Sequence, residues 1–211
     1  MSSKKNPVVS WKLYCIIDEK VTRGKDPVKL AGILFKKGVD VVQLRFKNMP
    51  SYRLIPIARK IMHLARKYKC ALIINDRPDV MLASGATGVH LGKGDMSPRD
   101  FGTLLRPGNL IGRTVHSKKE AGELSYKDLN YIGAGPVFPT PVKHKLKSQG
   151  VDFIAKVKDL AQVPVFAIGG INHKNLEQIL LSGADGICVT RATDEVGILL
   201  KTINQFKKPI S

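Results

Sequence analysis

The sequence predicts a single (β/α)8 barrel, and three observations carry this prediction. Short apolar segments alternate along the chain with segments whose apolar residues recur at helical spacing. Eight such strand–helix pairs fit within the 211 residues. This length suits one domain, and barrels of this class often run past about 200 residues. We therefore expect one barrel domain over residues 1–211, in which residues 1–11 form an N-terminal extension.

The strands are expected at residues 12–17, 39–44, 71–74, 88–91, 110–114, 131–134, 164–168 and 186–189. Asp26 followed by Pro27 predicts the start of the first helix, since aspartate caps helices and proline suits their first position. In the second helix an apolar stripe runs from Leu54 to Tyr68, and Pro56 predicts that the regular part starts there. A doubly wound open sheet is the rival, but its usual strand number is about five or six.

Composition excludes several classes of protein. Hydrophobic residues make up 43% of the chain, as in ordinary globular proteins. No apolar run approaches the roughly 20 residues that span a bilayer, and the start lacks the apolar core of a secretory signal. The three cysteines (Cys15, Cys70 and Cys188) lie too far apart for a zinc motif or a disulfide framework. We expect a cytoplasmic protein with no membrane partner.

The net charge of +18 raises the question of nucleic-acid binding. Lysine and arginine are nevertheless spread along the chain without a block of five like charges, and aromatic residues are few. No RNA-binding aromatic signature is present. A diffuse positive field also suits an enzyme whose substrates carry phosphate. We expect small phosphorylated substrates and no nucleic acid.

Two acidic residues follow neighbouring strands in the middle of the chain. Asp76 comes just after the strand at 71–74, and Asp95 comes just after the strand at 88–91. A strand–helix–strand crossover places both strand ends at the same edge of the sheet. Magnesium uses one or two carboxylates in this way and fills its other positions with water and phosphate oxygens. The alternative is that each aspartate only caps the helix that follows it.

Loops after barrel strands build the active site at one rim. The polar residues expected there are Gln43, Arg45, Lys47, Asn75, Asp76, Arg77, Asp95, Thr114, His116, Thr140, Lys143, Gly169, Gly170, Thr190 and Arg191. Gly169, Gly170 and the loop after the eighth strand occupy the usual phosphate site of such barrels. His116 is suited to exchange protons near neutral pH.

Each of these residues has a structural alternative as well. Gln43 and Arg45 alternate on one strand and satisfy each other inside the barrel if both point inward. The glycine pair Gly169-Gly170 serves a tight turn in the plainer interpretation. His90 lies within a strand and is expected to be a core histidine.

Five motifs occur in order along the chain: Gln43-Leu44-Arg45-x-Lys47, Ile74-Asn75-Asp76-Arg77-x-Asp79-Val80, Gly88-Val89-His90-Leu91-Gly92-x-x-Asp95, Gly135-Pro136-Val137-Phe138-Pro139-Thr140 and Ala167-Ile168-Gly169-Gly170-Ile171. Together they resemble the thiamine phosphate synthases and the related thiazole tautomerases. The resemblance extends from Tyr14 to about Ala192, which is nearly the whole chain.

The resemblance implies a (β/α)8 enzyme that couples hydroxymethylpyrimidine diphosphate with a thiazole phosphate and releases pyrophosphate. It implies Mg²⁺ as cofactor, held by Asp76 and Asp95. The residues implied for catalysis are Arg45, Lys47, Thr114, His116 and Lys143. Those implied for substrate binding are Gln43, Leu44, Arg45, Phe46, Lys47, Asn75, Thr114, Thr140, Pro141, Val142, Lys143, Gly169, Gly170, Thr190 and Arg191. Of these, Gln43 and Thr114 orient the pyrimidine, and Thr140, Gly170, Thr190 and Arg191 receive the thiazole phosphate.

The chain departs from the family pattern at four positions. Phe46 replaces a usual glutamate, Thr114 and Arg191 each replace a usual serine, and Val142 replaces a usual threonine. Val142 removes a donor near the substrates and bears most on catalytic efficiency. The lysine-rich loop at 141–150 is suited to close over the diphosphate as a lid.

Two other functions stay open at this stage. A thiazole tautomerase would use His116 for proton transfer but would not need a metal–pyrophosphate site. A non-catalytic relative that binds thiazole phosphate would agree with Phe46 and Val142. Retention of the basic and acidic residues favours the synthase, and the chain is expected to be a monomer or a homo-oligomer.

Overall fold

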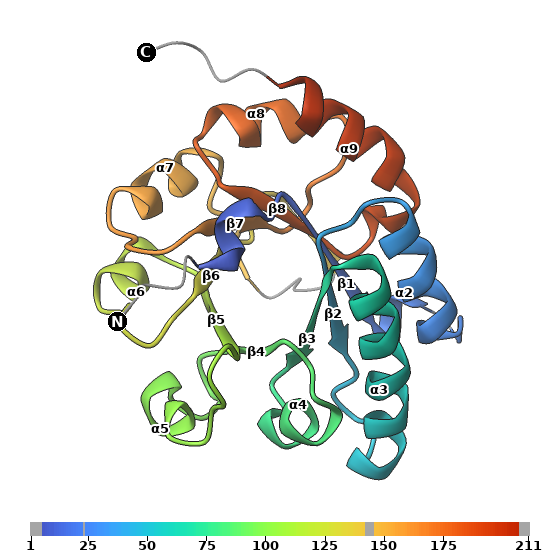
Figure 1. The fold of residues 1–211 in the computed structure, drawn as a ribbon. Coiled ribbons are helices and arrows are strands. Elements are labelled where there is room, and N and C mark those ends of the chain that lie inside the picture. The colour runs from blue at the N-terminus through green and yellow to red at the C-terminus, as the bar shows by residue number, and fades with distance from the viewer. Residues whose placement is uncertain (1–5, 23, 142–145, 207–211) are drawn as a thin grey trace.

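Eight parallel strands form a closed barrel in chain order, with β8 paired back to β1. This arrangement is seen in a computed structural model that describes residues 6–22, 24–141 and 146–206 (Figure 1). The strands are β1 Leu13–Asp18, β2 Val41–Arg45, β3 Ala71–Asn75, β4 Gly88–Leu91, β5 Leu110–Val115, β6 Tyr131–Ala134, β7 Val165–Ile168 and β8 Gly186–Val189. The predicted (β/α)8 barrel is confirmed, and the predicted strands are correct to within two residues at their ends.

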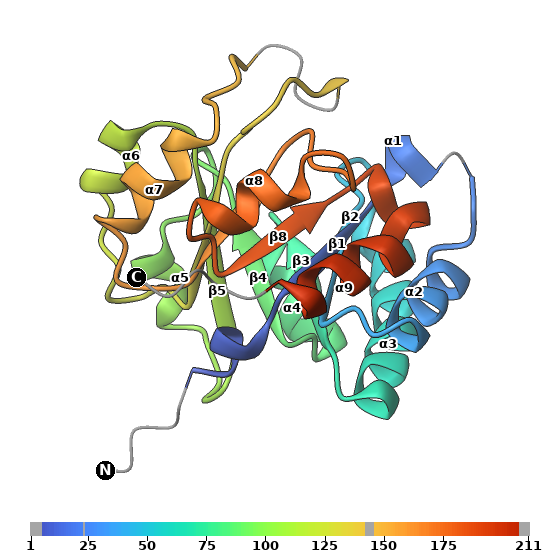
Figure 2. The ribbon, with the colours of Figure 1, turned by 90° about the horizontal axis from the view of Figure 1, so that it is seen from above.

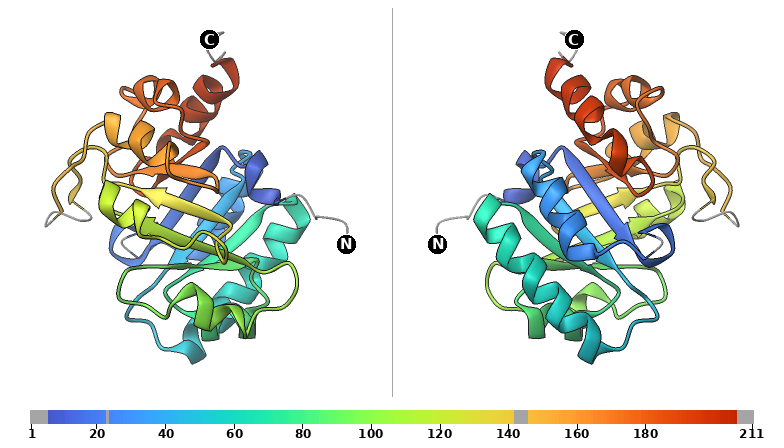
Figure 3. Two further views of the ribbon diagram at one scale, coloured as in Figure 1. Left: turned by 90° about the vertical axis from the view of Figure 1, so that its left-hand side faces the viewer. Right: turned by 90° about the vertical axis from the view of Figure 1, so that its right-hand side faces the viewer.

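Helices surround the strands on all sides (Figures 1 and 3). They are α1 Glu19–Thr22, α2 Pro27–Lys36, α3 Ser51–Tyr68, α4 Pro78–Ser84, α5 Pro98–Gly102, α6 Lys118–Gly122, α7 Asp152–Lys158, α8 Leu176–Leu181 and α9 Val196–Gln205, with 3₁₀ turns η1 Pro7–Ser10 and η3 Ala192–Glu195. No helix in this described part of the chain is long and apolar enough to cross a membrane.

The expected cap of α2 is confirmed, whereas the expected start of α3 is wrong. Asp26 Oδ1 accepts a hydrogen bond from Val28 N at 2.8 Å. The helix α3 starts at Ser51, so Pro56 lies inside it. Proline removes the amide that would bond to the carbonyl of Tyr52, and Tyr52 lies on the exposed face, where water can serve that carbonyl. The buried stripe that includes Leu54 and Ile61 outweighs this loss.

Alternate residues along each strand belong to two separate cores. Leu13 and Cys15 pack between the strands and the helices, whereas Tyr14 and Ile16 point into the barrel. This alternation follows from the two-residue repeat of a strand. Near the carboxyl ends of the strands, polar side chains that follow the inward set point into the barrel, and those in the loops beyond lie at its rim.

The first residues close the base of the barrel. Val8 is fully buried, and Trp11 packs edge-on against Tyr131 with ring centroids 6.0 Å apart. Asn6 Nδ2 donates to the carbonyl of Asn130 at 2.8 Å. The described part of the expected N-terminal extension is thus built into the barrel core. Figure 2 shows η1 at the bottom and α1 at the opposite end, where the carboxyl ends of the strands open.

Candidate active site

The structure brings Asp76 and Asp95 together at the carboxyl ends of β3 and β4. A Cβ placed on Gly92 would lie 3.1 Å from Asp95 Oδ2 and 4.0 Å from Asp76 Oδ1, so both carboxylates face this glycine. Lys47 Nζ, from the loop after β2, lies 2.5 Å from Asp76 Oδ2. The expected meeting of Asp76 and Asp95 at one rim is confirmed, and Lys47 lies at the same rim, as expected.

Neither aspartate caps a helix, so that alternative is wrong. The N-cap residue of α4 is Arg77, which makes no side-chain cap bond, and that of α5 is Ser97. Asp76 has a left-handed backbone with φ 60°, and its amide donates to the His90 carbonyl at 2.9 Å. Aspartate tolerates this conformation better than most residues. Asp95 Oδ2 accepts from Gly92 N at 2.5 Å, which holds the second carboxylate in place.

The two carboxylates have opposite electrostatic environments. Burial would raise the pKa of Asp76, but the hydrogen bonds from Lys47 and Asp95, together with the positive charges of Lys47 and Arg45, outweigh it and hold that pKa below its usual range. Burial and the facing Asp76 raise the pKa of Asp95. Two carboxylates in contact repel each other unless a cation or a proton lies between them.

This donor set fits Mg²⁺, which binds one or two carboxylates and takes its other ligands from water and phosphate. Within the described residues no group of three or more His, Cys, Asp or Glu side chains forms a fuller metal site. Beside the pair, Asn75 Nδ2 is buried without a hydrogen-bond partner in the described structure. A buried donor of this kind is costly unless a ligand satisfies it, and a phosphate oxygen would do so.

Asp18, at the end of β1, is a site residue that the sequence analysis missed. Its side chain is 2% exposed and forms an ion pair with Arg45 NH1. The signal was present, because Asp18 directly follows the predicted strand at 12–17 and therefore stands at the active rim. Gln43 and Arg45 do not pair with each other, since Gln43 Nε2 donates to Tyr14 OH at 2.7 Å.

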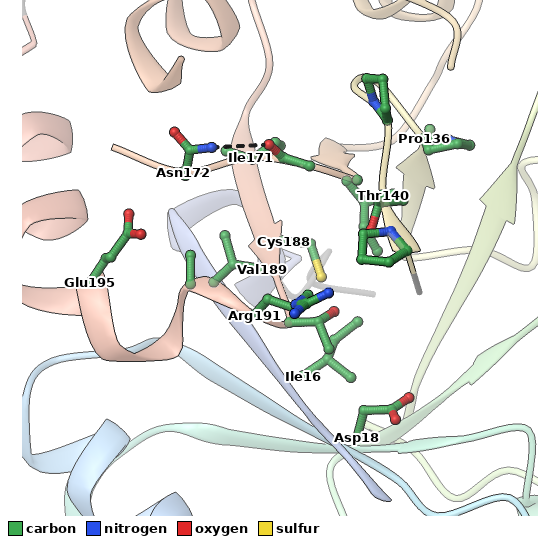
Figure 4. Close-up of a pocket in the computed structure, with 18 of the residues that line it drawn as sticks. Ile16, Asp18, Pro136, Thr140, Ile171, Asn172, Cys188, Val189, Arg191 and Glu195 are labelled. Atoms are coloured by element: carbon green, nitrogen blue, oxygen red, sulfur yellow. Dashed lines mark hydrogen bonds between the residues drawn. The ribbon is translucent and has the colours of Figure 1, made fainter. Parts of the chain in front are cut away.

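A cavity of about 350 Å³ opens on the other half of the rim, between the ends of β6, β7, β8 and β1. Ile16, Ile168, Cys188 and Val189 give it an apolar wall. In Figure 4, Thr140 lies across the cavity from Val189. The predicted substrate residues that line it are Arg45, Thr140, Pro141, Gly169, Gly170, Thr190 and Arg191.

Gly169 and Gly170 serve both a tight turn and the cavity. Their φ angles are +101° and +68°, a region that favours glycine. A Cβ on Gly170 would lie 2.6 Å from Phe138 Cβ. The lack of side chains lets this backbone form the cavity wall, where its amides can meet an anion.

Other expected site residues lie apart from this cavity. The side chains of Leu44 and Phe46 are buried in the outer core, so only their backbone atoms are left for substrate contact. His116 Nδ1 lies 2.5 Å from the carbonyl oxygen of Gly135, and His116 N donates to Glu120 at 2.8 Å. Val142 and Lys143 lie outside the described residues, because residues 142–145 of the expected lid at 141–150 are not among them. Thr114 lies inside the barrel beside His90.

One half of the rim thus carries cations, carboxylates and a buried amide nitrogen without a partner in the described structure, while the other half is a cavity with apolar residues and glycines in its wall. Asp18 and Arg45 also line this cavity. A closed barrel with this rim defines an enzyme that handles small phosphorylated molecules.

Known proteins narrow this class to one family. The family model described as thiamine monophosphate synthase matches residues 13–193. The thiamine-phosphate synthase of Caldanaerobacter subterraneus is 39% identical over 180 residues, 85% of this chain and 84% of its own. That of Pyrococcus horikoshii is 39% identical over 181 residues, 86% of each chain. The solved thiamine phosphate pyrophosphorylase from Pyrococcus furiosus is 33% identical with a TM-score of 0.83, covering 92% of this chain and 96% of that one. The chain belongs to the thiamine monophosphate synthase family, as its five motifs predicted.

Proposed function

We propose that this chain is a transferase that joins hydroxymethylpyrimidine diphosphate to a thiazole phosphate, forming thiamine phosphate and pyrophosphate. The observation that carries the proposal is the cluster of Asp76, Asp95 and Lys47 on the same rim as the glycine-lined cavity. The reaction needs a place for a leaving diphosphate and, next to it, a place for a second phosphorylated substrate. The two halves of the rim provide both.

The polar half of the rim is suited to the diphosphate. Asp76 and Asp95 would hold Mg²⁺, which supplies neutralisation of the charge that accumulates on departing pyrophosphate. Lys47 and Arg45 add fixed positive charge, and the unpaired Asn75 Nδ2 offers a donor. Asp18 keeps the Arg45 guanidinium in one orientation.

The cavity is suited to the thiazole phosphate. Backbone amides at Gly169, Gly170 and Thr190 would bind its phosphate, while Ile16 and Ile168, which line the cavity, would contact the ring. Departure of pyrophosphate leaves a stabilised cation on the pyrimidine carbon, and the thiazole nitrogen captures it. No protein nucleophile is needed, so positioning supplies much of the acceleration.

A thiazole tautomerase has less support from this geometry. Isomerisation of a thiazole does not require the Asp76–Asp95–Lys47 cluster. His116, the residue expected to transfer the proton, is not one of the described residues that line the cavity. The free thiols of Cys15 and Cys70 support a cytoplasmic location for the enzyme. The choice between monomer and homo-oligomer stays a prediction, as does the expected lack of nucleic-acid binding.

The test is an assay with both substrates, with and without Mg²⁺, on the unmodified chain and on Asp95→Asn. We expect Mg²⁺-dependent pyrophosphate release, and a fall in kcat/KM of about 100-fold or more in Asp95→Asn, because a metal ligand is lost. Asp100→Asn is the control. It removes the charge of a nearby carboxylate on α5 that accepts a hydrogen bond from Ser97 Oγ, and it should change kcat/KM little. Equal turnover by Asp95→Asn would contradict the metal site. Isomerisation of thiazole without pyrophosphate release, abolished in His116→Gln, would instead identify a tautomerase.

A further inference from the structure

A chain of hydrogen bonds crosses the interior of the barrel from Gln43 to Thr114. Gln43 Nε2 donates to Tyr14 OH at 2.7 Å, and the Tyr14 and Tyr131 hydroxyl oxygens are 3.0 Å apart. Tyr131 OH lies 3.2 Å from His90 Nδ1. His90 Nε2 in turn lies 2.7 Å from Thr114 Oγ1. The two ends of this chain are the two residues expected to orient the pyrimidine.

The two tyrosines in the middle of this series of hydrogen bonds are held rigidly. Tyr14 is 1% exposed and Tyr131 is fully buried. A Cβ on Gly112 would lie 2.1 Å from Tyr131 Cζ, so the phenol ring occupies the space that any other residue would fill. Trp11 and Phe166 pack against the same ring. The hydroxyl of Tyr131 therefore has one position relative to His90.

The series of hydrogen bonds from Gln43 to Thr114 also has a direction, because an amide nitrogen can only donate. The Tyr14 oxygen accepts from Gln43 and directs its own proton to Tyr131. Tyr131 in turn has one proton left, which it donates to His90 Nδ1. Burial raises the pKa of both tyrosines, so each phenol keeps its proton. A neutral imidazole that accepts at Nδ1 carries its hydrogen on Nε2, which faces Thr114 Oγ1.

We propose that His90 is a positioning residue that fixes Thr114 as a hydrogen-bond donor towards the pyrimidine substrate. His90 Nε2–H donates to the Thr114 oxygen, so the single hydroxyl proton of Thr114 is left for an acceptor at the rim. The ligand that suits this donor is a heterocycle with an unprotonated ring nitrogen, and a ring carrying N–H at that position is rejected because two donors would meet. The inference rests on the proposed function only for the identity of this ligand.

The tautomer of His90 is the direct test, and it needs no enzyme activity. Long-range ¹H–¹⁵N correlation spectra of the labelled, substrate-free chain at neutral pH should show His90 neutral with its hydrogen on Nε2. Tyr131→Phe should give a mixture of the two tautomers, because Nδ1 loses its donor. Tyr126→Phe is the matched control, since it removes a hydroxyl that donates to the Ala121 carbonyl at 2.9 Å outside the barrel, and it should leave the His90 signals unchanged. A hydrogen on Nδ1, or an imidazolium, would overturn the proposal.

Kinetics test the second half of the inference. His90→Leu and Thr114→Val should each raise KM for the pyrimidine diphosphate about 10-fold and leave KM for the thiazole phosphate unchanged. His90→Gln keeps an amide that can donate to Thr114 and should recover much of the loss. The double variant His90→Leu/Thr114→Val should have the same KM for the pyrimidine diphosphate as Thr114→Val alone, because both changes remove the same donor, the Thr114 hydroxyl. Additive rises in this KM, or equal rises in the KM values of both substrates, would refute the role of His90. If the protein showed the expected His90 tautomer but no synthase activity, the proposed function and the pyrimidine ligand would be refuted. The direction of the hydrogen bonds from Gln43 to Thr114 would still be supported.

Discussion

At the scale of single residues, the cations of the rim owe their positions to carboxylates. The Asp18 side chain is nearly inaccessible to water. It accepts a hydrogen bond from the backbone amide of Lys20 at 2.9 Å and forms an ion pair with Arg45. A buried carboxylate is stable only when it is paired and hydrogen-bonded, and both conditions are met. The consequence for function is that the guanidinium of Arg45 is oriented before substrate arrives.

Asp18→Asn should separate this orienting role from stability. The amide keeps the shape of the side chain but removes the charge, so Arg45 loses its fixed direction and kcat/KM should fall about 10-fold. Steady-state kinetics on both substrates measure this. Lys158→Ala breaks the Lys158–Asp185 ion pair of 2.6 Å near the other end of the barrel and should leave kcat/KM unchanged. An equal loss of activity in the two variants would show that Asp18 acts only on stability.

Gly170→Ala should weaken binding of the thiazole phosphate. The new Cβ would meet Phe138 Cβ at 2.6 Å and the Pro139 carbonyl at 2.8 Å, which displaces the backbone that lines the cavity. We expect KM for the thiazole phosphate to rise about 10-fold or more. Gly183→Ala is the matched control: it has φ +83° but no neighbour within 4 Å of the new Cβ, so it should cost only about 1 kcal/mol of stability. An unchanged KM in Gly170→Ala would show that the phosphate binds elsewhere.

At the scale of elements, the helices begin where local chemistry places them. Asp26 accepts from Val28 N at 2.8 Å and from Lys29 N at 3.3 Å, and Pro27 follows at the first helical position. Ser97 and Ser117 cap α5 and α6 in the same way. Because these caps fix the loops before the helices, they also fix the residues at the active rim.

Asp26→Ala should lower the free energy of unfolding by about 1 kcal/mol, the usual effect of losing a cap. Urea denaturation followed by far-UV circular dichroism measures the change. Asp26→Asn keeps a side-chain oxygen acceptor and should lose much less. If both variants were equally destabilised, the charge of Asp26 rather than its hydrogen bonds would be what α2 requires.

At the scale of the whole molecule, the barrel interior is divided along its length. Trp11 and Val8 close the base, and the hydrogen-bonded residues from Gln43 to Thr114 cross the interior from β2 through β1 and β6 to β4 and β5. Ile16 and Ile168 line the cavity at the carboxyl ends of the strands. This arrangement places the carboxylate cluster of Asp76 and Asp95 and the glycine-lined cavity at a single opening.

Trp11→Ala should destabilise the whole barrel by about 3 kcal/mol or more, because it empties a core position at the closed end. Trp11 is the only tryptophan in the chain, so unfolding must be followed by circular dichroism rather than by tryptophan fluorescence. The folded fraction should keep its kcat, since the rim lies at the other end. A loss of kcat with unchanged stability would place Trp11 in the active site instead.

Much of the site follows from chain order, and the exceptions share one cause. Asp76 and Asp95 could be assigned to one rim because parallel strands end at the same edge. Asp18 follows a predicted strand in the same way, but its pairing with Arg45, 27 residues away on β2, is a tertiary contact that local sequence does not show. Pro56 was misjudged because the buried stripe of α3, which is a tertiary feature, tolerates one missing amide.

The order of strands and helices, and the list of polar residues that end the strands, were determined by the sequence alone, because local periodicity and capping depend on near neighbours. The partners of those residues were decided only by the tertiary structure: Arg45 with Asp18, Gln43 with Tyr14, and the two aspartates with each other. These contacts depend on strand register and on which way each side chain turns inside a closed barrel. Neither property can be read from residues close together in the chain.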